Sequence, residues 1–448
     1  MMDRPRTQWV DRRLEEGTLL ARSVELPIRA PRSVLKTLAK PRIMWAGPGE
    51  PTTIGSGRSM MVTTERSHRF KTLQRDLDAL FAGADIEIDN PVARPRVIGG
   101  VSFHDRKTLN GPWSNFPAGG FVLPTILVTI GPDTMWVTVS EFDSDVDETT
   151  VENRLDVIAN DLMELSPPVT SPSGPGIRAS DHRTSADQWR EQIDGVLERI
   201  RTGELQKLVL AQSLEVSLDQ SINLSDVIDR LAVSYPDCHR FLWETPAGSA
   251  FFGATPERLV SKLGRYVETS ALAGSTGRGD TDTEDRWLAD ELTNNHKDLQ
   301  EHGFVRDTIL EQLKPYTTAI RTEERQIRRL ATVQHLETPI TGTLADDPHI
   351  LELVDVLHPT PAVGGVPPDT AMAVIATTEP FDRGWYAAPF GWCDAAGDGN
   401  FAVGIRSAVA DERTATLYAG AGIVEESHPA REWDEVQLKY RPILDALE

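Results

Sequence analysis

The sequence predicts an α+β protein in which large, mostly antiparallel β-sheets pack together and carry helices on the outside. Residues 119–142 read as two strands joined at the turn signal "GPDT". Residues 241–261 read as a second hairpin, and helical patterns fall between the hairpins rather than after each single strand. This order favours antiparallel sheets over a doubly wound parallel sheet.

The first part of the chain carries two expected helices and ends in a linker. Residues 62–83 have a helical period, and residues 143–165 are acidic and partly helical. Residues 166–176, "SPPVTSPSGPG", have the composition of a linker or loop. We therefore expect an N-terminal region over 1–165 that packs onto the same fold as residues 177–448. The apolar face of the first helix would consist of Phe70, Leu73, Leu77 and Leu80.

After the linker, Ser185 and Gln188 have the spacing of a capping box, which predicts the start of a helix. The side chains on its apolar face would be Trp189, Ile193, Val196, Leu197 and Ile200.

Further along, residues 207–216 and 415–424 predict strands, and residues 430–447 predict the last helix. Residues 283–313 predict a long helix with an internal break, with Thr283 as its N-terminal cap.

The composition excludes some classes of protein. The chain has 448 residues, with 68 Asp and Glu against 46 Lys and Arg, so its formal net charge is −22. This charge disfavours non-specific binding to nucleic acid and to anionic membranes. Because the acidic residues are spread along the chain, we expect adaptation to high salt; the alternative is an ordinary acidic enzyme.

The cysteines and the apolar segments bear on the cellular compartment of the protein. Cys238 and Cys393 follow no metal or redox spacing, which fits a reducing compartment. The charged N-terminus lacks the apolar core of a signal peptide, and no run of about 18 apolar residues exists to cross a membrane. We expect a cytoplasmic protein.

Two stretches place paired carboxylates on a helix face. In "KDLQEHGF", Asp298 and Glu301 are three residues apart. The adjacent histidines, His296 and His302, are six apart, so they do not match the zinc-protease spacing. Oxygen ligands without nitrogen or sulfur partners suit Mg²⁺. The alternative is a solvated acidic face.

The second stretch, "REWDEVQLKY", places Glu432 and Glu435 three residues apart, with Lys439 one turn further. Surface charge is again the alternative. Since Mg²⁺ takes one or two carboxylates and keeps waters, the two helices together could supply one metal site.

Anion binding is suggested by two other stretches. Arg406 in "GIRSA" is expected on a strand, where a buried guanidinium would need an anion; a surface arginine is the alternative. Gly420 and Gly422 in "YAGAGIV" would let backbone N–H groups approach an anion closely. "HPTPAVGG" (358–365) reads as a tight loop.

Ten ordered motifs carry a resemblance to a known family: "KLVLAQ", "GATPERLV", "ALAGSTGRG", "KDLQEH", "VQHLETPITG", "LHPTPAVGG", "EPFDRGWYAAPFGW", "VGIRSA", "YAGAGIV" and "REWDEVQLKY". In this order they resemble the chorismate-utilising enzymes, which include isochorismate, salicylate, anthranilate and aminodeoxychorismate synthases. The resemblance covers roughly residues 185–448. It departs from the usual motifs at Gln212, where arginine is usual, and at Ser275, where threonine is usual.

The resemblance implies an α+β fold and an Mg²⁺-dependent site that binds chorismate. Glu301 and Glu435 are the implied direct metal ligands, with Asp298 and Glu432 as nearby or water-mediated partners. Lys439 is implied near the metal-bound carboxylate of the substrate. Further residues match pocket positions of the family: Arg406 and Tyr386 for the enolpyruvyl carboxylate, Gly274, Ser275, Gly420 and Gly422 for the backbone lining, and His335 and Thr360 in the pocket.

The branch of the family depends on the nucleophile. Lys207 matches the base of the branch that uses water, and Glu257 matches its general acid. Lys207 and Ala273 both differ from the ammonia-using enzymes, so no glutaminase subunit is expected. The resemblance therefore implies an isochorismate synthase that serves menaquinone or siderophore synthesis. The alternatives are a salicylate synthase, which shares these residues, and a non-catalytic descendant that binds an anion.

Overall fold

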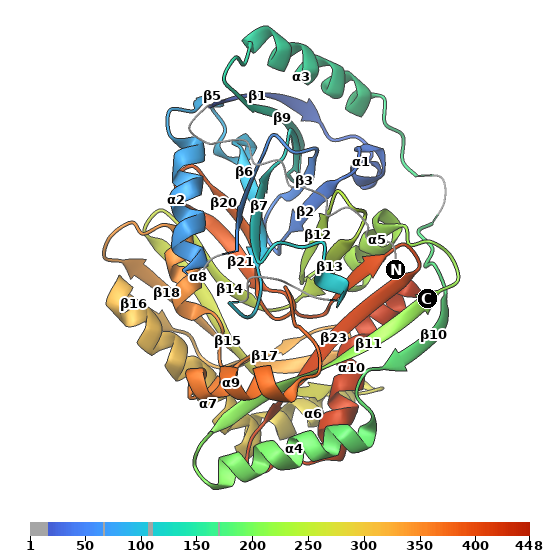
Figure 1. Ribbon diagram of the computed structural model, residues 1–448, viewed down its shortest axis with the longest axis vertical. Helices are drawn as coiled ribbons and strands as arrows, with labels where there is room; N and C mark the ends of the chain where they lie inside the picture. The colour runs from blue at the N-terminus through green and yellow to red at the C-terminus, as the bar shows by residue number, and fades with distance from the viewer. Residues whose placement is uncertain (1–16, 66–67, 106–110, 169–170) are drawn as a thin grey trace.

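The computed structural model of the protein describes residues 17–65, 68–105, 111–168 and 171–448. Two large sheets form its centre, and helices lie around them (Figure 1). Within the described residues every strand pairing is antiparallel except that of β1 with β5. The predicted α+β class with mostly antiparallel sheets is confirmed.

The larger sheet has 13 strands in the order β10-β11-β23-β22-β13-β12-β2-β3-β8-β9-β1-β5, with β19 beside β11. Their bounds are β1 Thr18–Pro27, β2 Arg42–Ala46, β3 Thr52–Ser56, β5 Asp85–Glu87, β8 Ile126–Ile130, β9 Thr134–Asp143, β10 Ile177–His182, β11 Lys207–Leu218, β12 His239–Glu244, β13 Ala250–Thr255, β19 Gly365–Val366, β22 Ser407–Asp411 and β23 Thr414–Ile423.

The smaller sheet has 10 strands in the order β16-β18-β15-β14-β21-β20-β6-β7-β4, with β17 beside β18. Their bounds are β4 Met60–Thr64, β6 Arg96–Val101, β7 Gly119–Leu123, β14 Arg258–Leu263, β15 Tyr266–Gly277, β16 Thr317–Thr322, β17 Gln326–Arg329, β18 Val333–Leu344, β20 Pro389–Asp394 and β21 Gly399–Val403.

The α-helices are α1 Pro31–Thr37, α2 Arg69–Phe81, α3 Glu148–Met163, α4 Ala186–Arg201, α5 Leu224–Ser234, α6 Asp282–Asn294, α7 His296–Leu313, α8 Ile350–Leu357, α9 Pro368–Thr378 and α10 Pro429–Leu447. Short 3₁₀ turns cover η2 Pro91–Ala93, η3 Gly111–Trp113 and η4 Lys314–Tyr316. None of the helices in the described part of the chain is long and apolar enough to cross a membrane.

The two sheets pack face to face through aromatic side chains. Phe390 on β20 of the smaller sheet lies 4.9 Å from Phe241 on β12 and 6.0 Å from Phe251 on β13, measured between ring centroids. Trp243 and Trp385 approach to 4.8 Å in the same layer. Each large aromatic ring removes extensive apolar area from water, so this layer is the main core of the molecule.

Strands from the first 165 residues form one end of each sheet (Figure 1). In the larger sheet they meet the rest of the chain where β2 pairs with β12, and in the smaller sheet where β6 pairs with β20. The buried guanidinium of Arg42 forks onto the carboxylate of Glu244 across one of these junctions, at 2.7 and 3.0 Å. The boundaries at 1–165, 166–176 and 177–448 stay a prediction.

Both predicted hairpins are present, but each predicted range also contains a strand of the smaller sheet, before the first hairpin and after the second. Within 119–142, β8 and β9 pair as expected around Gly131–Asp133, whereas β7 belongs to the smaller sheet. Within 241–261, β12 and β13 pair, whereas β14 belongs to the smaller sheet. Pro124 and Pro256 stand at these two crossings, because proline has no N–H with which to continue a ladder.

Two helix predictions need correction. The range 62–83 is not wholly helical: its first residues complete β4, and α2 spans Arg69–Phe81, with the four expected apolar side chains buried. The range 283–313 breaks at Asn295 as expected, but the cap is Thr281 rather than Thr283. The Thr281 hydroxyl accepts the N–H of Glu284 at 3.2 Å, so the helix begins earlier.

The capping box at the start of α4 is confirmed. The Ser185 hydroxyl accepts the N–H of Gln188, and the Gln188 side chain accepts the N–H of Ser185. Trp189, Ile193, Val196 and Leu197 are buried behind it, and Ile200 is partly buried.

Candidate active site

One buried pocket gathers most of the predicted site residues. It lies where the glycine-bearing end of β23 and the start of β11 meet α7, α10, β15 and the loops around residues 362 and 386. The lining residues are Val209, Pro256, Glu257, Leu272, Ala273, Gly274, Ser275, Glu301, His335, Ala362, Val363, Tyr386, Ile405, Arg406, Gly420, Gly422, Glu435 and Lys439. Eleven of these were predicted, and the apolar wall was not.

Lys207 is not itself a lining residue of this pocket, but it forms an ion pair with Glu301, which is. Lys207 is the first residue of β11 and is fully buried, with its Nζ 2.9 Å from Oε1 of Glu301. Burial alone would raise the pKa of Glu301, but Lys207 reverses this and lowers the pKa below its ordinary value. Gly422 permits the contact, since a Cβ there would lie 2.5 Å from Glu301 Oε1 and 3.2 Å from Lys207 Cε.

Two of the other predicted metal ligands, Glu432 and Glu435, are paired with lysines. Glu432 is 1% exposed and accepts a 2.8 Å hydrogen bond from Lys297, while Glu435 lies 2.6 Å from Lys439. The pKa of Asp298 is raised to about 7 by burial and then by the nearby carboxylate of Glu301. Within the described residues, no three His, Cys, Asp or Glu side chains are grouped as a metal site.

Even so, this set of donors fits Mg²⁺ in its chemistry. All four are carboxylates, and one oxygen of Glu432, Oε2, is buried without any hydrogen-bond partner. Burial and the neighbouring Glu435 raise the pKa of Glu432. Carboxylates that repel one another in a buried place are stabilised by a divalent cation, and Mg²⁺ prefers oxygen ligands.

Glu257 lies in the turn that follows β13. Its N–H donates to Thr255 Oγ1 at 3.2 Å, and its carbonyl accepts the N–H of Val403 at 2.9 Å, so both sheets hold its backbone. Burial raises the pKa of Glu257 to about 7, although Lys207 and Arg406 act in the opposite direction. The carboxyl group can therefore keep a proton near neutral pH. Thr360 does not line the pocket itself, and its buried hydroxyl acts to lower the pKa of this carboxyl.

Arg406 is not on a strand, which corrects the prediction. It lies in the turn between β21 and β22 with φ of 52°, a left-handed conformation that few non-glycine residues adopt. The turn lets its carbonyl accept the N–H of Ala254 at 3.1 Å while the buried side chain enters the pocket. Burial lowers the pKa of Arg406, and a buried guanidinium of this kind suits an anionic ligand.

The pocket also contains the imidazole of His335, which lies near two cationic side chains. His335 Nδ1 lies 2.7 Å from the Ser275 hydroxyl, and its Nε2 is buried without a partner. Burial, with Arg406 and Lys439 nearby, holds the pKa of His335 well below its ordinary value. Lys439 also donates to the carbonyl of Gly420 at 2.8 Å, which fixes its side chain along β23.

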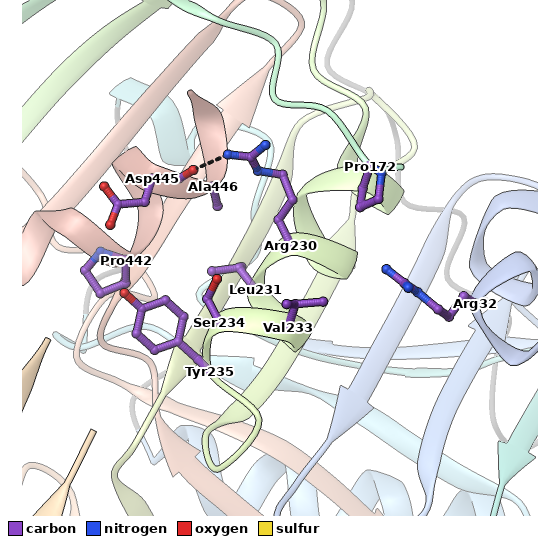
Figure 2. A pocket seen from close by; sticks show the side chains of 10 residues that line it. All are labelled: Arg32, Pro172, Arg230, Leu231, Val233, Ser234, Tyr235, Pro442, Asp445 and Ala446. Carbon is purple, nitrogen blue, oxygen red and sulfur yellow. Dashed lines mark hydrogen bonds between the residues drawn. The ribbon is translucent and has the colours of Figure 1, made fainter. Parts of the chain in front are cut away.

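A second hollow lies between α1, α5 and α10, away from these residues. Figure 2 shows Arg230 bound to the backbone carbonyl of Asp445, with Arg32 and exposed Val233 further along the wall. Among its described lining residues Asp445 is the one acidic group, so the hollow lacks the paired acids and bases of the first pocket. We therefore place the candidate active site in the first pocket.

An α+β fold that buries several acids and bases around one pocket defines an enzyme that acts on a small charged molecule. The comparison with known families gives the particular class. Residues 7–448 match the family described as "Chorismate binding enzyme", and the chain belongs to this family.

Individual relatives cover most of the chain. It is 32% identical over 415 residues to "Isochorismate synthase MenF" of Bacillus subtilis, covering 91% of this chain and 88% of that protein. It is 33% identical over 441 residues to "Salicylate biosynthesis isochorismate synthase" of Pseudomonas aeruginosa, covering 97% and 91%. The solved structure of MenF from Escherichia coli has the same fold, with a TM-score of 0.78 at 24% identity over 97% of this chain and 96% of that one.

Proposed function

We propose that the protein is an isochorismate synthase that interconverts chorismate and isochorismate with Mg²⁺ as cofactor. In this reaction water adds at C2 of the ring while the C4 hydroxyl leaves as water, so the net change is an isomerisation. The observation that carries the proposal is that buried Glu257 and Arg406 line one pocket with Glu301, and that buried Lys207 forms an ion pair with Glu301 at 2.9 Å. The names of both relatives support the same activity.

Two proton transfers are assigned to these residues. Lys207 would take a proton from the attacking water once its amine has lost the proton that holds its ion pair with Glu301, and Glu257 would give a proton to the departing hydroxyl. A general acid must hold its proton until the bond breaks, and burial raises the pKa of Glu257 to about 7. The acid role is therefore compatible with neutral pH.

Substrate binding is assigned to the cationic and metal-binding sides of the pocket. Arg406 and Tyr386 would bind the enolpyruvyl carboxylate, with Gly274, Ser275, His335, Gly420 and Gly422 shaping the space and buried Thr360 acting on Glu257 from outside the lining. Glu301 and Glu435 would hold Mg²⁺ directly, with Asp298 and Glu432 acting through water. The bound ion would supply positive charge for the ring carboxylate. Lys439 would contact the same carboxylate.

The test is to incubate the protein with chorismate and Mg²⁺ and to separate the products by chromatography. We expect isochorismate to accumulate toward an equilibrium mixture, from either direction. Salicylate and pyruvate would instead identify a salicylate synthase, and anthranilate formed with ammonium would contradict the use of water. Chorismate binding without turnover, at low and at high salt, would identify a non-catalytic descendant.

The role of the metal is tested separately with a readout other than turnover. Titration calorimetry with Mg²⁺ should show binding to the wild type, and Glu301→Gln should weaken this binding because one carboxylate is lost. Equal Mg²⁺ affinity in both proteins would remove Glu301 from the ligand set.

Four features stay predictions. They are a role in menaquinone or siderophore synthesis, a cytoplasmic location, activity without a glutaminase subunit, and adaptation to high salt.

A further inference from the structure

One wall of the pocket is built from three segments that no continuous strand ladder joins. On the side of β11 away from β23, strand β19 pairs only with Lys207 and Leu208, and β10 begins to pair at Leu214. The edge between these pairings faces the loop around residue 363 and the segment 379–386. Val209, Val363 and Tyr386 from these segments all line the pocket.

Buried Arg383 and Glu379 connect these segments. Their side chains are 1% and 3% exposed, and the guanidinium forks onto the carboxylate at 2.5 and 2.8 Å. The same guanidinium donates to the carbonyl of Val363 at 2.8 Å and to the carbonyl of Val209 at 2.9 Å. Glu379 in turn accepts the N–H of Ala211 at 2.8 Å. One ion pair thus satisfies the carbonyls of Val209 and Val363 and the N–H of Ala211, in addition to the direct bond from the Val209 N–H to the Gly364 carbonyl at 2.8 Å.

The third segment is held through the backbone of Arg383 itself. The N–H of Tyr386 donates to the Arg383 carbonyl at 2.9 Å, which closes a tight turn. Phe103 lies under the guanidinium, 4.3 Å from its central carbon to the ring centroid, and limits its movement. Tyr386 then stacks on Tyr418 of β23, with centroids 5.3 Å apart and an interplanar angle of 22°.

We propose that Arg383 and Glu379 are positioning residues that set the substrate-binding wall formed by Val209, Val363 and Tyr386. This inference rests on the proposed function, because it names the pocket as the chorismate site. Neither side chain lines the pocket, so each acts through the backbone it holds. A lysine cannot replace the arginine, since an ammonium group cannot make the planar fork and reach both carbonyls.

The chain offers a matched control in Arg42 and Glu244. This pair is also buried, at 5% and 4% exposure, and has the same fork, with a further bond from Arg42 to the carbonyl of Leu35 at 2.6 Å. It joins β2 to β12 and contributes no residue to the candidate active site. Arg42→Lys and Arg383→Lys should therefore lower thermal stability in a comparable way.

Substrate kinetics separate positioning from stability. We expect Arg383→Lys to raise the KM for chorismate roughly 10-fold to 100-fold, with a smaller change in kcat, because misplacement by about 1 Å has effects of that size. Arg42→Lys should leave the KM unchanged. Glu379→Gln keeps an oxygen acceptor for the N–H of Ala211, so it should raise the KM by an intermediate amount. If Arg383→Lys does not fold, the KM of Glu379→Gln tests the proposal.

The outcomes are distinct from those for the proposed function. A KM equal to that of the wild type in Glu379→Gln and in folded Arg383→Lys would overturn the positioning role while leaving the proposed activity intact. Should the wild type bind chorismate without converting it, the same comparison is made on the Kd from titration calorimetry. A wild type that neither binds nor converts chorismate would overturn the proposed function, and this inference with it.

Discussion

Replacing Gly422 by alanine is expected to disable the site while leaving the fold intact. The added Cβ would lie 2.5 Å from Glu301 Oε1, 3.2 Å from Glu301 Cδ and 3.2 Å from Lys207 Cε. Ordinary van der Waals contact begins at 3.4 Å, so the carboxylate oxygen must retreat by 3.4 − 2.5 = 0.9 Å. Glu301 cannot make room for the added Cβ and also keep its 2.9 Å contact with Lys207 unless one of these two side chains shifts.

The size of the effect follows from that displacement. A misplacement of about 1 Å in an active site can cost roughly 100-fold in rate, which is about 2.7 kcal/mol of transition-state stabilisation. We therefore expect kcat/KM for isochorismate formation to fall about 100-fold in Gly422→Ala. The assay is chromatographic separation of chorismate and isochorismate, with a thermal unfolding scan on the same sample.

Gly303→Ala is the matched control on the same helix as Glu301. A Cβ at Gly303 meets nothing within 4 Å, and alanine is favoured over glycine in a helix by about 1 kcal/mol. This variant should be at least as stable as the wild type and equally active. The reasoning would be refuted if folded Gly422→Ala retained the kcat/KM of the wild type.

Three further outcomes are expected. Glu257 must be protonated to act as an acid, and burial raises its pKa to about 7, so kcat/KM should fall as the pH rises through about 7. A kcat/KM that stays constant between about pH 6 and 9 would contradict this role. Glu257→Gln should abolish most of the activity and, with it, the decrease at high pH. Lys207→Ala should lower kcat at least about 100-fold, since general bases contribute that much; full activity would exclude Lys207 as the base. Ser185→Ala should lower the free energy of unfolding in urea by about 1 kcal/mol through loss of the cap, with no change in KM; unchanged stability would show that the cap contributes nothing.

Local sequence signals predicted where helices and strands occur better than they predicted which sheet each strand joins. The capping box at Ser185 and the hairpin at residues 131–133 are determined by neighbours in sequence, so the pattern was sufficient. Pro124 and Pro256 were also visible, but alternation of apolar residues looks the same whichever sheet receives the strand. The crossing between sheets depends on long-range pairing, which a single sequence does not contain.

The candidate site shows a similar division. Arg406 was recognised as a residue needing an anion, yet its placement on a strand was wrong, because no local signal marks the positive φ that turns it into the pocket. Arg383 and Glu379 stand four residues apart in the motif "EPFDRGWYAAPFGW", and the spacing alone does not show that they are buried. Their backbone partners lie on β11 and in the loop at Val363, which come together only in the folded molecule.

The two carboxylate pairs illustrate why equal spacing does not mean equal roles. Asp298 and Glu301 on α7 are three apart, as are Glu432 and Glu435 on α10, so each pair shares a helix face. Packing then separates them: Glu301 and Glu435 line the pocket, whereas buried Glu432 turns to Lys297.

The phase of each helix is set by what it packs against. Gly422 leaves the space on β23 that Glu301 occupies, and Lys439 is held along the same strand by the carbonyl of Gly420. A larger side chain at Gly422 would displace the carboxylate of Glu301, whereas a Cβ at Gly420 would meet the carbonyl of Leu210 at 2.8 Å and the hydroxyl of Tyr386 at 3.3 Å. The pattern on the helices therefore names the candidate ligands, and the space at Gly422 lets Glu301 reach the pocket.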